Sequence, residues 1–176
     1  MTATDEIRAP ITARLRGEPL GPQHHDALRA LLTDPRVAAT LGGTPPPEWI
    51  GEHIAGVQEH WREHGFGWYG WRDRATGAFV ARGGPRRVHV AGRDEVEVGW
   101  TVAPERWGQG IATELGARSV ALAFGPLGLG DVVSFTLPDN LASRRVMEKL
   151  GLAFEADIDY KGWPHVLYRL RRTSSA

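Results

Sequence analysis

Two glycines, Gly108 and Gly110, stand between an alternating apolar segment and a segment with helical periodicity. Glycine lets the chain turn tightly into the helix, so that the unpaired N–H groups of the first helical turn point at one place. With the positive end of the helix dipole they form an anion site, for which a pyrophosphate is the natural occupant. Thr113 adds a hydroxyl donor. A glycine pair alone can equally shape an ordinary loop.

Two other nucleotide-binding motifs do not fit. The segment from Gly108 to Thr113 lacks the third glycine of a dinucleotide fingerprint, and no acidic residue closes a following strand at the right distance. The sequence contains no Gly-Lys-Ser or Gly-Lys-Thr, which excludes a P-loop ATPase.

A second polar group lies downstream. Asn140, Ser143, Met147 and Leu150 follow at spacings of three, four and three, so they share one helix face. Met147 and Leu150 should point inward, which directs Asn140 and Ser143 towards a sheet near the helix start. Buried polar groups there need partners. The alternative is that Asp139 or Asn140 caps the helix and Ser143 completes the hydrogen bonds of its first turn.

The elements around these motifs alternate in type. We expect strands at 11–16, 66–71, 78–82, 86–90, 95–102, 131–136, 152–156 and 164–170. Helical patterns follow Pro22, run from Ile50 to Gly65, begin again after Gly110 and span 139–150. In the strand 95–102, Val96, Val98 and Trp100 share one face and Glu97 lies on the other. The pattern predicts one mixed α/β (α+β) domain with a largely antiparallel sheet.

Composition narrows the class of protein. A chain of 176 residues is long enough for one domain, which we place at 8–172, with 1–7 and 173–176 as flexible ends. The 21 basic and 21 acidic side chains cancel, so we expect no nucleic-acid partner. No apolar run reaches the length of a membrane span, and the acidic start lacks the apolar core of a signal peptide. The absence of cysteine excludes disulfides and a cysteine nucleophile. We expect a cytoplasmic protein.

Together the two patches resemble the GNAT family of acyl-CoA-dependent N-acyltransferases, and more closely its RimJ/RimL-like branch. The resemblance is carried by the stretches 97–102, 107–114 and 140–151. The family's pyrophosphate signature, Gln/Arg-x-x-Gly-x-Gly/Ala, falls on Trp107, Gly110 and Ala112. Trp107 stands where the signature has Gln or Arg, as is usual in that branch. This difference does not affect the backbone N–H groups that would hold the pyrophosphate.

The resemblance implies a GNAT-type acyl-CoA N-acyltransferase fold, in which acetyl-CoA lies where two central parallel strands splay apart, here 95–102 and 131–136. It implies no metal. The backbone of Trp100 to Val102 would pair with the pantetheine arm, residues 108 to 113 would hold the pyrophosphate, and Asn140 would bond the pantetheine region. The implied cofactor-binding residues are Trp100, Thr101, Val102, Trp107, Gly108, Gln109, Gly110, Ile111, Ala112, Thr113, Asn140 and Ser143.

In such enzymes an amine attacks the thioester directly. An unperturbed amine is mostly protonated at neutral pH, so a carboxylate that takes its proton, directly or through water, speeds the reaction. Glu97 is our candidate base, with Glu95 on the same face as its competitor. Ser143 is our candidate donor to the departing thiolate. For each, the alternative is a structural role: a carboxylate on a solvated strand face, and a residue of the helix start.

The acceptor is not identified by the sequence. A protein N-terminal α-amine and a small-molecule amine both fit, and a non-catalytic acyl-CoA-binding or sensing module on the same fold is the alternative function. Dimers are common in such families, so we also consider a homodimer. Several of the seven tryptophans could wall the acceptor pocket, which would suit an apolar or cationic acceptor.

Histidines form two further groups. The string His60-Trp-Arg-Glu-His64 is similar to a zinc-peptidase motif, with His53 on the same helix face. We expect these histidines on the solvent side of the helix, because Trp61 already supplies its buried anchor, and we expect no metal. His24 and His25 are also expected at the surface.

Overall fold

A seven-stranded sheet forms the centre of the computed structural model, which describes residues 2–173. The strand order is β1-β2-β3-β4-β5-β7-β6. Neighbouring strands are antiparallel except β4 and β5, which run parallel. The strands are β1 (Leu15–Pro19), β2 (Tyr69–Asp73), β3 (Phe79–Val90), β4 (Arg93–Val102), β5 (Asp131–Thr136), β6 (Ala153–Tyr160) and β7 (Trp163–Arg171).

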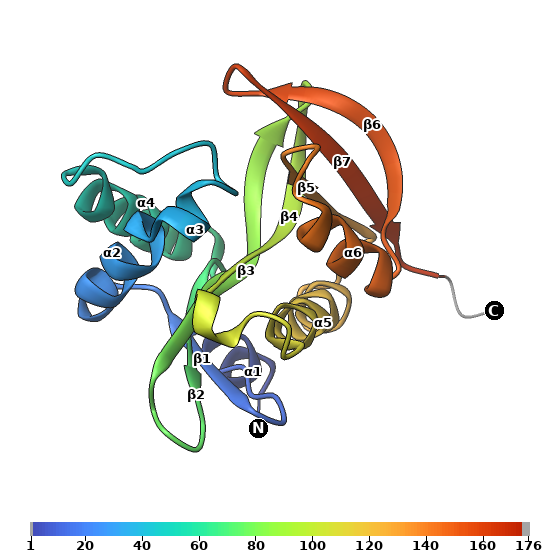
Figure 1. Ribbon diagram of the computed structural model, residues 1–176. Coiled ribbons are helices and arrows are strands. Elements are labelled where there is room, and N and C mark those ends of the chain that lie inside the picture. Colours follow the sequence, from blue (N-terminus) through green and yellow to red (C-terminus); the bar gives the residue numbers. More distant parts are fainter. Residues whose placement is uncertain (1, 174–176) are drawn as a thin grey trace.

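Helices cover both faces of this sheet (Figure 1). The short helices α2 (His25–Thr33) and α3 (Pro35–Ala38) pack with α4 (Trp49–His64) around Trp68. On the opposite face lie α5 (Ile111–Phe124) and α6 (Leu141–Lys149). Two 3-10 turns, η1 (Pro22–His24) and η2 (Pro104–Arg106), precede α2 and α5. This is the predicted mixed fold.

The predicted periodicities explain the packing of the two sides. In α4, Ile50, Ile54 and Val57 are buried, and Gly65 ends the helix with a left-handed φ of 71°. In β4, Val98 is buried against the α5 side, among Ala123 and Val132, whereas Glu97 lies on the α4 side. Because side chains alternate along β4, Val98 packs into the apolar core on one face and Glu97 lies among polar groups on the other.

β3 is one strand of twelve residues where two separate strands were predicted. The intervening Gly83, Gly84 and Pro85 remain in register with β4. A Cβ at Gly83 would lie 2.3 Å from the Gly99 carbonyl oxygen, so only glycine allows this close approach. The residues left between the two predicted strands therefore belong to one continuous strand.

The first strand begins later than predicted. Residues 11–16 were expected to form it, but β1 starts at Leu15 and Ile11 makes only an isolated bridge to Arg16. The backbone N–H of Thr12 donates to the Leu15 carbonyl at 2.9 Å, and Leu15 N–H donates to the Thr12 hydroxyl. This local turn reverses the chain before the strand begins.

Residues 3–8 form a helix, most of which falls in the stretch 1–7 that was expected to be a flexible end. Helix α1 (Ala3–Arg8) starts with a capping box between Thr2 and Asp5. The Tyr69 hydroxyl donates to the Ile7 carbonyl at 2.6 Å, and Arg118 forms an ion pair with Glu6 at 2.9 Å. These contacts join α1 to the domain. Of the other expected end, 173–176, residues 174–176 lie outside the described part.

Candidate active site

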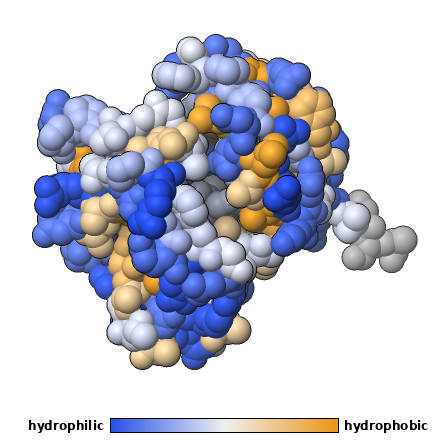
Figure 2. All heavy atoms as spheres, in the orientation of Figure 1, coloured by the Kyte–Doolittle hydropathy of each residue, from blue (hydrophilic) through white to orange (hydrophobic). Residues whose placement is uncertain are grey.

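A large cleft opens where β4 and β5 diverge. The two parallel strands share a single registered residue pair, Glu97 with Val133, and then separate. The resulting cleft has a volume of about 910 Å³ and is lined from both halves of the molecule. Figure 2 shows the surface hollowed at this place. Its size suits a substrate considerably larger than an amino acid.

One wall of the cleft is the turn that leads into α5. Gly108 and Gly110 have φ of 72° and 76°, the left-handed region that glycine adopts without strain. The first backbone hydrogen bond of the helix runs from Glu114 N–H to Gly110 O, at 3.0 Å. Among residues 2–173 no protein acceptor is found for the N–H groups of 108–113. The turn therefore presents a row of free donors at the positive end of a helix, as an anion requires.

A second wall is the free edge of β4. Ala103 N–H donates to Val80 on β3, and successive residues in an antiparallel pair turn their polar groups to alternate sides. Val102 and Trp100 therefore direct their N–H and C=O groups away from β3, towards the edge that β5 has left. The indole Nε1 of Trp107 donates a hydrogen bond to the Val102 carbonyl oxygen at 2.8 Å. The remaining groups of this edge are available to an extended ligand.

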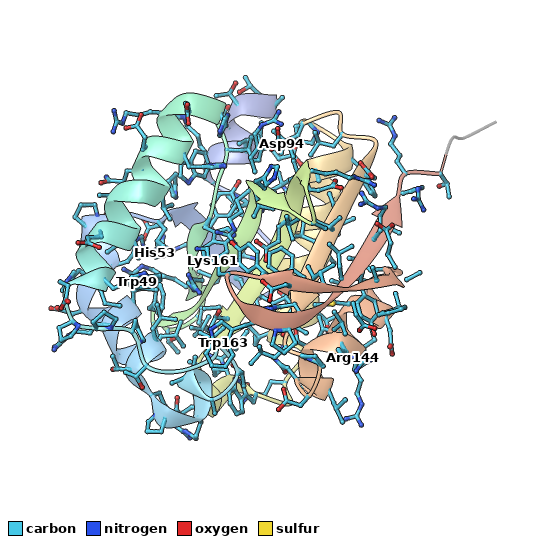
Figure 3. The ribbon with its side chains drawn as sticks, turned by 90° about the horizontal axis from the view of Figure 1, so that it is seen from above. Trp49, His53, Asp94, Arg144, Lys161 and Trp163 are labelled. Atoms are coloured by element: carbon cyan, nitrogen blue, oxygen red, sulfur yellow. The ribbon has the colours of Figure 1, made fainter. Side chains whose placement is uncertain are left out.

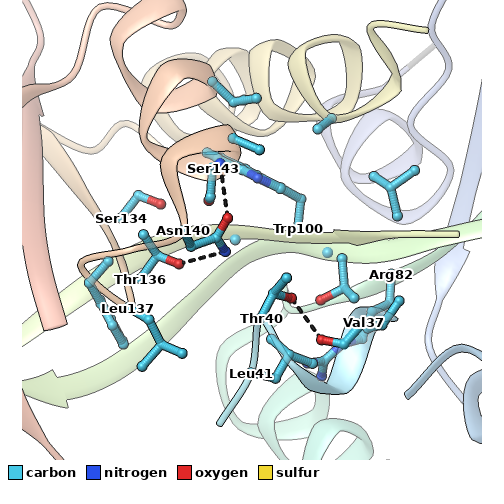
Figure 4. Close-up of a pocket in the computed structure, with 18 of the residues that line it drawn as sticks. Val37, Thr40, Leu41, Arg82, Trp100, Ser134, Thr136, Leu137, Asn140 and Ser143 are labelled. Carbon is cyan, nitrogen blue, oxygen red and sulfur yellow. Dashed lines mark hydrogen bonds between the residues drawn. The ribbon is translucent and has the colours of Figure 1, made fainter. Parts of the chain in front are cut away.

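A third wall of the cleft is formed by the start of α6, which follows β5 in the chain. Figure 4 shows Asn140 held on both sides: its Nδ2 donates to the Thr136 hydroxyl at 3.0 Å, and its Oδ1 accepts from Ser143 N–H at 3.2 Å. Asn140 is thus the N-cap of α6, as the structural alternative stated. It also lines the cleft, as does Ser143. For the Ser143 hydroxyl no hydrogen bond is found within residues 2–173.

The predicted residues converge on this one cleft, with one exception. Lining it are Glu97, Trp100, Thr101, Val102, Trp107, Gly108, Gly110, Ile111, Ala112, Thr113, Asn140 and Ser143. Gln109 is outside: its side chain donates to the Glu105 carbonyl and accepts from Arg106, so it stabilises the turn from behind.

Glu97 and its competitor Glu95 lie in different environments. Glu97 is only 6% exposed, and its Oε2 accepts from Arg86 Nε at 2.6 Å. For Glu97 Oε1 no protein donor is found in the described part of the chain. Although burial acts against it, the negative charge of Glu97 raises the pKa of Arg86 above its usual value. Glu95 instead pairs with the buried Arg169 and does not line the cleft.

The α4 side of the cleft contains residues that the sequence did not single out. Arg82 and Arg86 of β3 both lie over the Trp68 ring, 4.2 and 4.3 Å from its centroid. Nη1 of Arg82 lies 2.9 Å from Nε2 of His53. The only available signal was the spacing of four between the arginines on one strand face, which is weak without the fold.

The sequence placed His24, His53 and His60 wrongly, whereas the side chain of His25 lies at the surface as expected. His53 stacks on Trp49, with centroids 4.4 Å apart, and faces the cleft. His60 bonds the Phe66 carbonyl through Nδ1 and accepts from Arg87 N–H through Nε2, so both ring nitrogens are used. His24 is fully buried. Because α4 packs against β3 along its histidine row, these rings face protein rather than solvent. Within residues 2–173 no group of side chains suited to a metal ion is found.

Comparison with known proteins agrees with this geometry. The model of the acetyltransferase (GNAT) domain family matches residues 14–153. An "FsC-acetyl coenzyme A-N(2)-transacetylase" of Aspergillus fumigatus is 34% identical over 154 residues, or 80% of this chain. The aligned part spans 63% of that relative's length.

No helix in the described residues is both long and apolar enough to cross a bilayer.

Solved structures share the fold. An acetyltransferase of Agrobacterium tumefaciens has a TM-score of 0.82 at 23% identity, over 93% of this chain and 94% of its own. RimL, a ribosomal-protein α-N-acetyltransferase solved with coenzyme A, has a TM-score of 0.69 at 16% identity, over 92% of this chain and 96% of its own. The similarity extends beyond RimL, so it does not single out the RimJ/RimL-like branch. The matched domain, the fold and the splayed central strands together show that this chain belongs to the GNAT acetyltransferase family.

Proposed function

We propose that the protein is an N-acetyltransferase that moves an acetyl group directly from acetyl-CoA to a primary amine. One observation carries the proposal: the free donors of 108–113, the unpaired edge of β4 and the Glu97 carboxylate line the same cleft. A diphosphate, an extended amide-containing arm and a proton-accepting group at one site match the parts of this reaction.

The residues present fit the donor. The N–H groups at 108–113 suit the pyrophosphate, and the open groups of Trp100 and Val102 suit the amides of the pantetheine arm, which would add to β4 as a further strand. Asn140 and Thr136 line the same cleft. The coenzyme A bound in RimL and the name of the Aspergillus relative support the same donor.

In the proposed reaction the amine nitrogen bonds to the acetyl carbon and the carbon–sulfur bond breaks. Glu97 takes the proton of the amine, directly or through a water molecule, through the Oε1 atom that Arg86 leaves unbound. Arg86 holds the carboxylate in place. Coenzyme A departs as a thiolate, and the Ser143 hydroxyl donates to the sulfur. No acyl-enzyme forms, so no nucleophilic side chain is required.

The acceptor is a primary amine, and the RimJ/RimL-like assignment, with a protein N-terminal α-amine as acceptor, stays a proposal. The test is release of free thiol from acetyl-CoA in the presence of an amine panel, together with calorimetric titration of coenzyme A. We expect binding of coenzyme A and amine-dependent release. Binding without release would indicate a non-catalytic acyl-CoA module, and absence of binding would contradict the whole assignment.

A further inference from the structure

The acceptor side of the cleft carries positive charge that its own residues do not balance. We propose that the acceptor amine also bears an oxyanion, a carboxylate or a phosphate, which binds to Arg82 and Lys161. This inference rests on the proposed function and names the substrate class of the same site. Figure 3 shows Lys161 and Trp163 at the tip of the β6–β7 hairpin, with His53 and Trp49 on the neighbouring α4.

Arg82 is the central observation. Only 7% of this residue is exposed, yet no carboxylate lies within ion-pair distance of its guanidinium in the described part of the chain. Nη1 is bonded to His53, whereas Nε is buried with no partner within residues 2–173. Trp68 Nε1, in the same wall, is also buried without an acceptor. A buried charge and buried donors are costly unless paired, so this place lacks an anionic acceptor.

The neighbouring groups do not supply that anion. Glu97 is the only acidic residue that lines the cleft within residues 2–173, and its Oε2 already accepts a hydrogen bond from Arg86. His53 is neutral, because burial and the charges of Arg82, Arg86 and Lys161 lower its pKa to about 3. It therefore accepts from Arg82 and cannot offset its charge. Burial, followed by the charge of Arg86, likewise lowers the pKa of Arg82 to about 9.

The donor does not account for these cations either. Other basic residues of the cleft, Arg106, Arg145 and Lys149, lie beside the α5 turn or on α6, on the side where the free N–H groups face. Arg82 and Arg86 lie on the opposite face of the sheet, against Trp68. Lys161 reaches the cleft from the β6–β7 turn. Arg106, Arg145 and Lys149 therefore lie on the side of the donor phosphates. Arg82 and Lys161 lie on the other side, where the acceptor would bind.

Tryptophans do line this cleft, as the sequence suggested for some of them: Trp49, Trp68 and Trp163 are among its lining residues. An aromatic wall alone would suit an apolar or cationic acceptor, but the Trp68 ring is already covered by two arginines of the protein. A polycation such as a polyamine would meet like charges there. An oxyanion would instead accept from the planar Arg82 fork and from Lys161, each a charge-assisted hydrogen bond.

The test compares matched acceptors that differ only in the oxyanion. With saturating acetyl-CoA, kcat/KM is measured for 4-aminobutanoate against 4-aminobutanamide and butylamine, and for phosphoethanolamine against ethanolamine. We expect the anionic member of at least one set to be preferred roughly 10- to 100-fold, the range of one or two charged hydrogen bonds. Which set shows the preference distinguishes carboxylate from phosphate.

Variants then locate the preference. Arg82→Met should bring the ratio close to one. Lys161→Gln, at an exposed turn where folding is not at risk, should lower it several-fold. Arg29→Gln, an exposed residue of α2 that does not line the cleft, is the matched control and should leave the ratio unchanged. Thiol release that is equal for anionic and neutral amines, or a ratio that neither cleft variant changes, would overturn the inference.

A binding measurement separates this inference from the proposed function. N-acetyl-4-aminobutanoate and its amide are titrated calorimetrically into the protein with coenzyme A present. The carboxylate should bind roughly 10-fold more tightly than the amide, and Lys161→Gln should reduce the difference. This result would support the anion site even if no amine released thiol, an outcome that counts against the enzyme assignment alone. N-acetyl-phosphoethanolamine and N-acetylethanolamine are compared in the same way, and equal binding within both pairs would contradict the anion site.

Discussion

The two sides of the cleft are built from different parts of the chain. The side proposed to bind the acyl donor consists mainly of backbone: the amides of 108–113 and the free edge of β4, with Trp107 and Asn140 holding these segments in shape. The acceptor side consists of side chains, with Arg82 and Arg86 from β3, His53 from α4 and Lys161 from the β6–β7 turn. The first side depends on local conformation, whereas the second depends on contacts between distant segments. Substitutions should therefore affect the two sides in different ways.

The largest effect is expected from Glu97→Gln. An amide cannot take up the proton of the amine, so kcat should fall roughly 10²- to 10⁴-fold, the usual contribution of general-base catalysis. The affinity for coenzyme A should change little, because Glu97 lies on the α4 side. Steady-state kinetics and calorimetry measure the two quantities. An unchanged kcat would remove Glu97 from the mechanism.

Glu95→Gln is the matched control on the same face of β4. Glu95 bonds Arg169 at 2.8 and 3.1 Å, and Arg169 keeps its bonds to Glu155 and Asp131 when Glu95 is changed. We expect kcat to be preserved and the free energy of unfolding to fall by about 1 kcal/mol. A kcat as low as that of Glu97→Gln would show that both carboxylates act in the reaction.

The next largest effect tests the backbone side. Gly110→Val places a branched side chain at a φ of 76°, where L-residues are strained by about 1–2 kcal/mol, and turns the N–H groups of 111–113 out of line. We expect the affinity for coenzyme A to fall roughly 10- to 100-fold, as when one or two charged hydrogen bonds are lost. Calorimetry with coenzyme A measures this loss.

Gly128→Val controls for the strain itself. Gly128 has a φ of 63°, open space around its Cβ position and no place in the cleft. This variant should lose a similar free energy of unfolding while binding coenzyme A normally. If both variants bound coenzyme A equally well, the turn at 108–113 would not be the pyrophosphate site.

Ser143→Ala should have a smaller effect. Its hydroxyl is proposed to donate to the departing thiolate, but a thiolate is already a good leaving group, so we expect kcat to fall only roughly tenfold. The backbone N–H of Ser143 still bonds Asn140, so the start of α6 and the affinity for coenzyme A should persist. Full activity would show that Ser143 only belongs to the helix start.

The last effect is on folding stability rather than on catalysis, and it concerns the acceptor side and pH. The pKa of His53 is about 3 in the folded protein and near 6.5 when unfolded, so between these values the unfolded chain binds more protons. Folding stability contributed by neutral His53 is complete above pH 6.5 and declines as the pH falls towards 3, by about 1 kcal/mol per pH unit. Denaturant unfolding of wild type and His53→Gln at pH 7 and pH 5 measures the difference. Equal losses in both proteins would contradict the buried neutral state of His53.

Much of the fold, and the gathering of the candidate donor-binding residues in one cleft, could be predicted because the signals are local. Gly108 and Gly110 need positive φ wherever such a turn occurs, and the alternation in 95–102 separates Glu97 from Val98 in any sheet. Local patterns were wrong where long-range contacts decide. His24 and His53 looked like surface residues, but packing between α2, α4 and the first three strands buries the former and directs the latter to Arg82. Residues 83–85 were left between two predicted strands, because the pairing of Gly83 and Gly84 against Trp100 and Gly99 cannot be seen in the sequence.

The sequence by itself therefore determined the mixed sheet, the glycine turn into α5 and the polar start of α6, since each follows from the conformations that neighbouring residues allow. Only the tertiary structure decided which cations share a wall, that Arg86 holds Glu97 while Arg82 meets no carboxylate among residues 2–173, and that Gln109 turns away from the cleft. The physical reason is the range of the interactions. Backbone dihedrals are set within a few residues, whereas charge balance depends on side chains that folding brings together from distant parts of the chain.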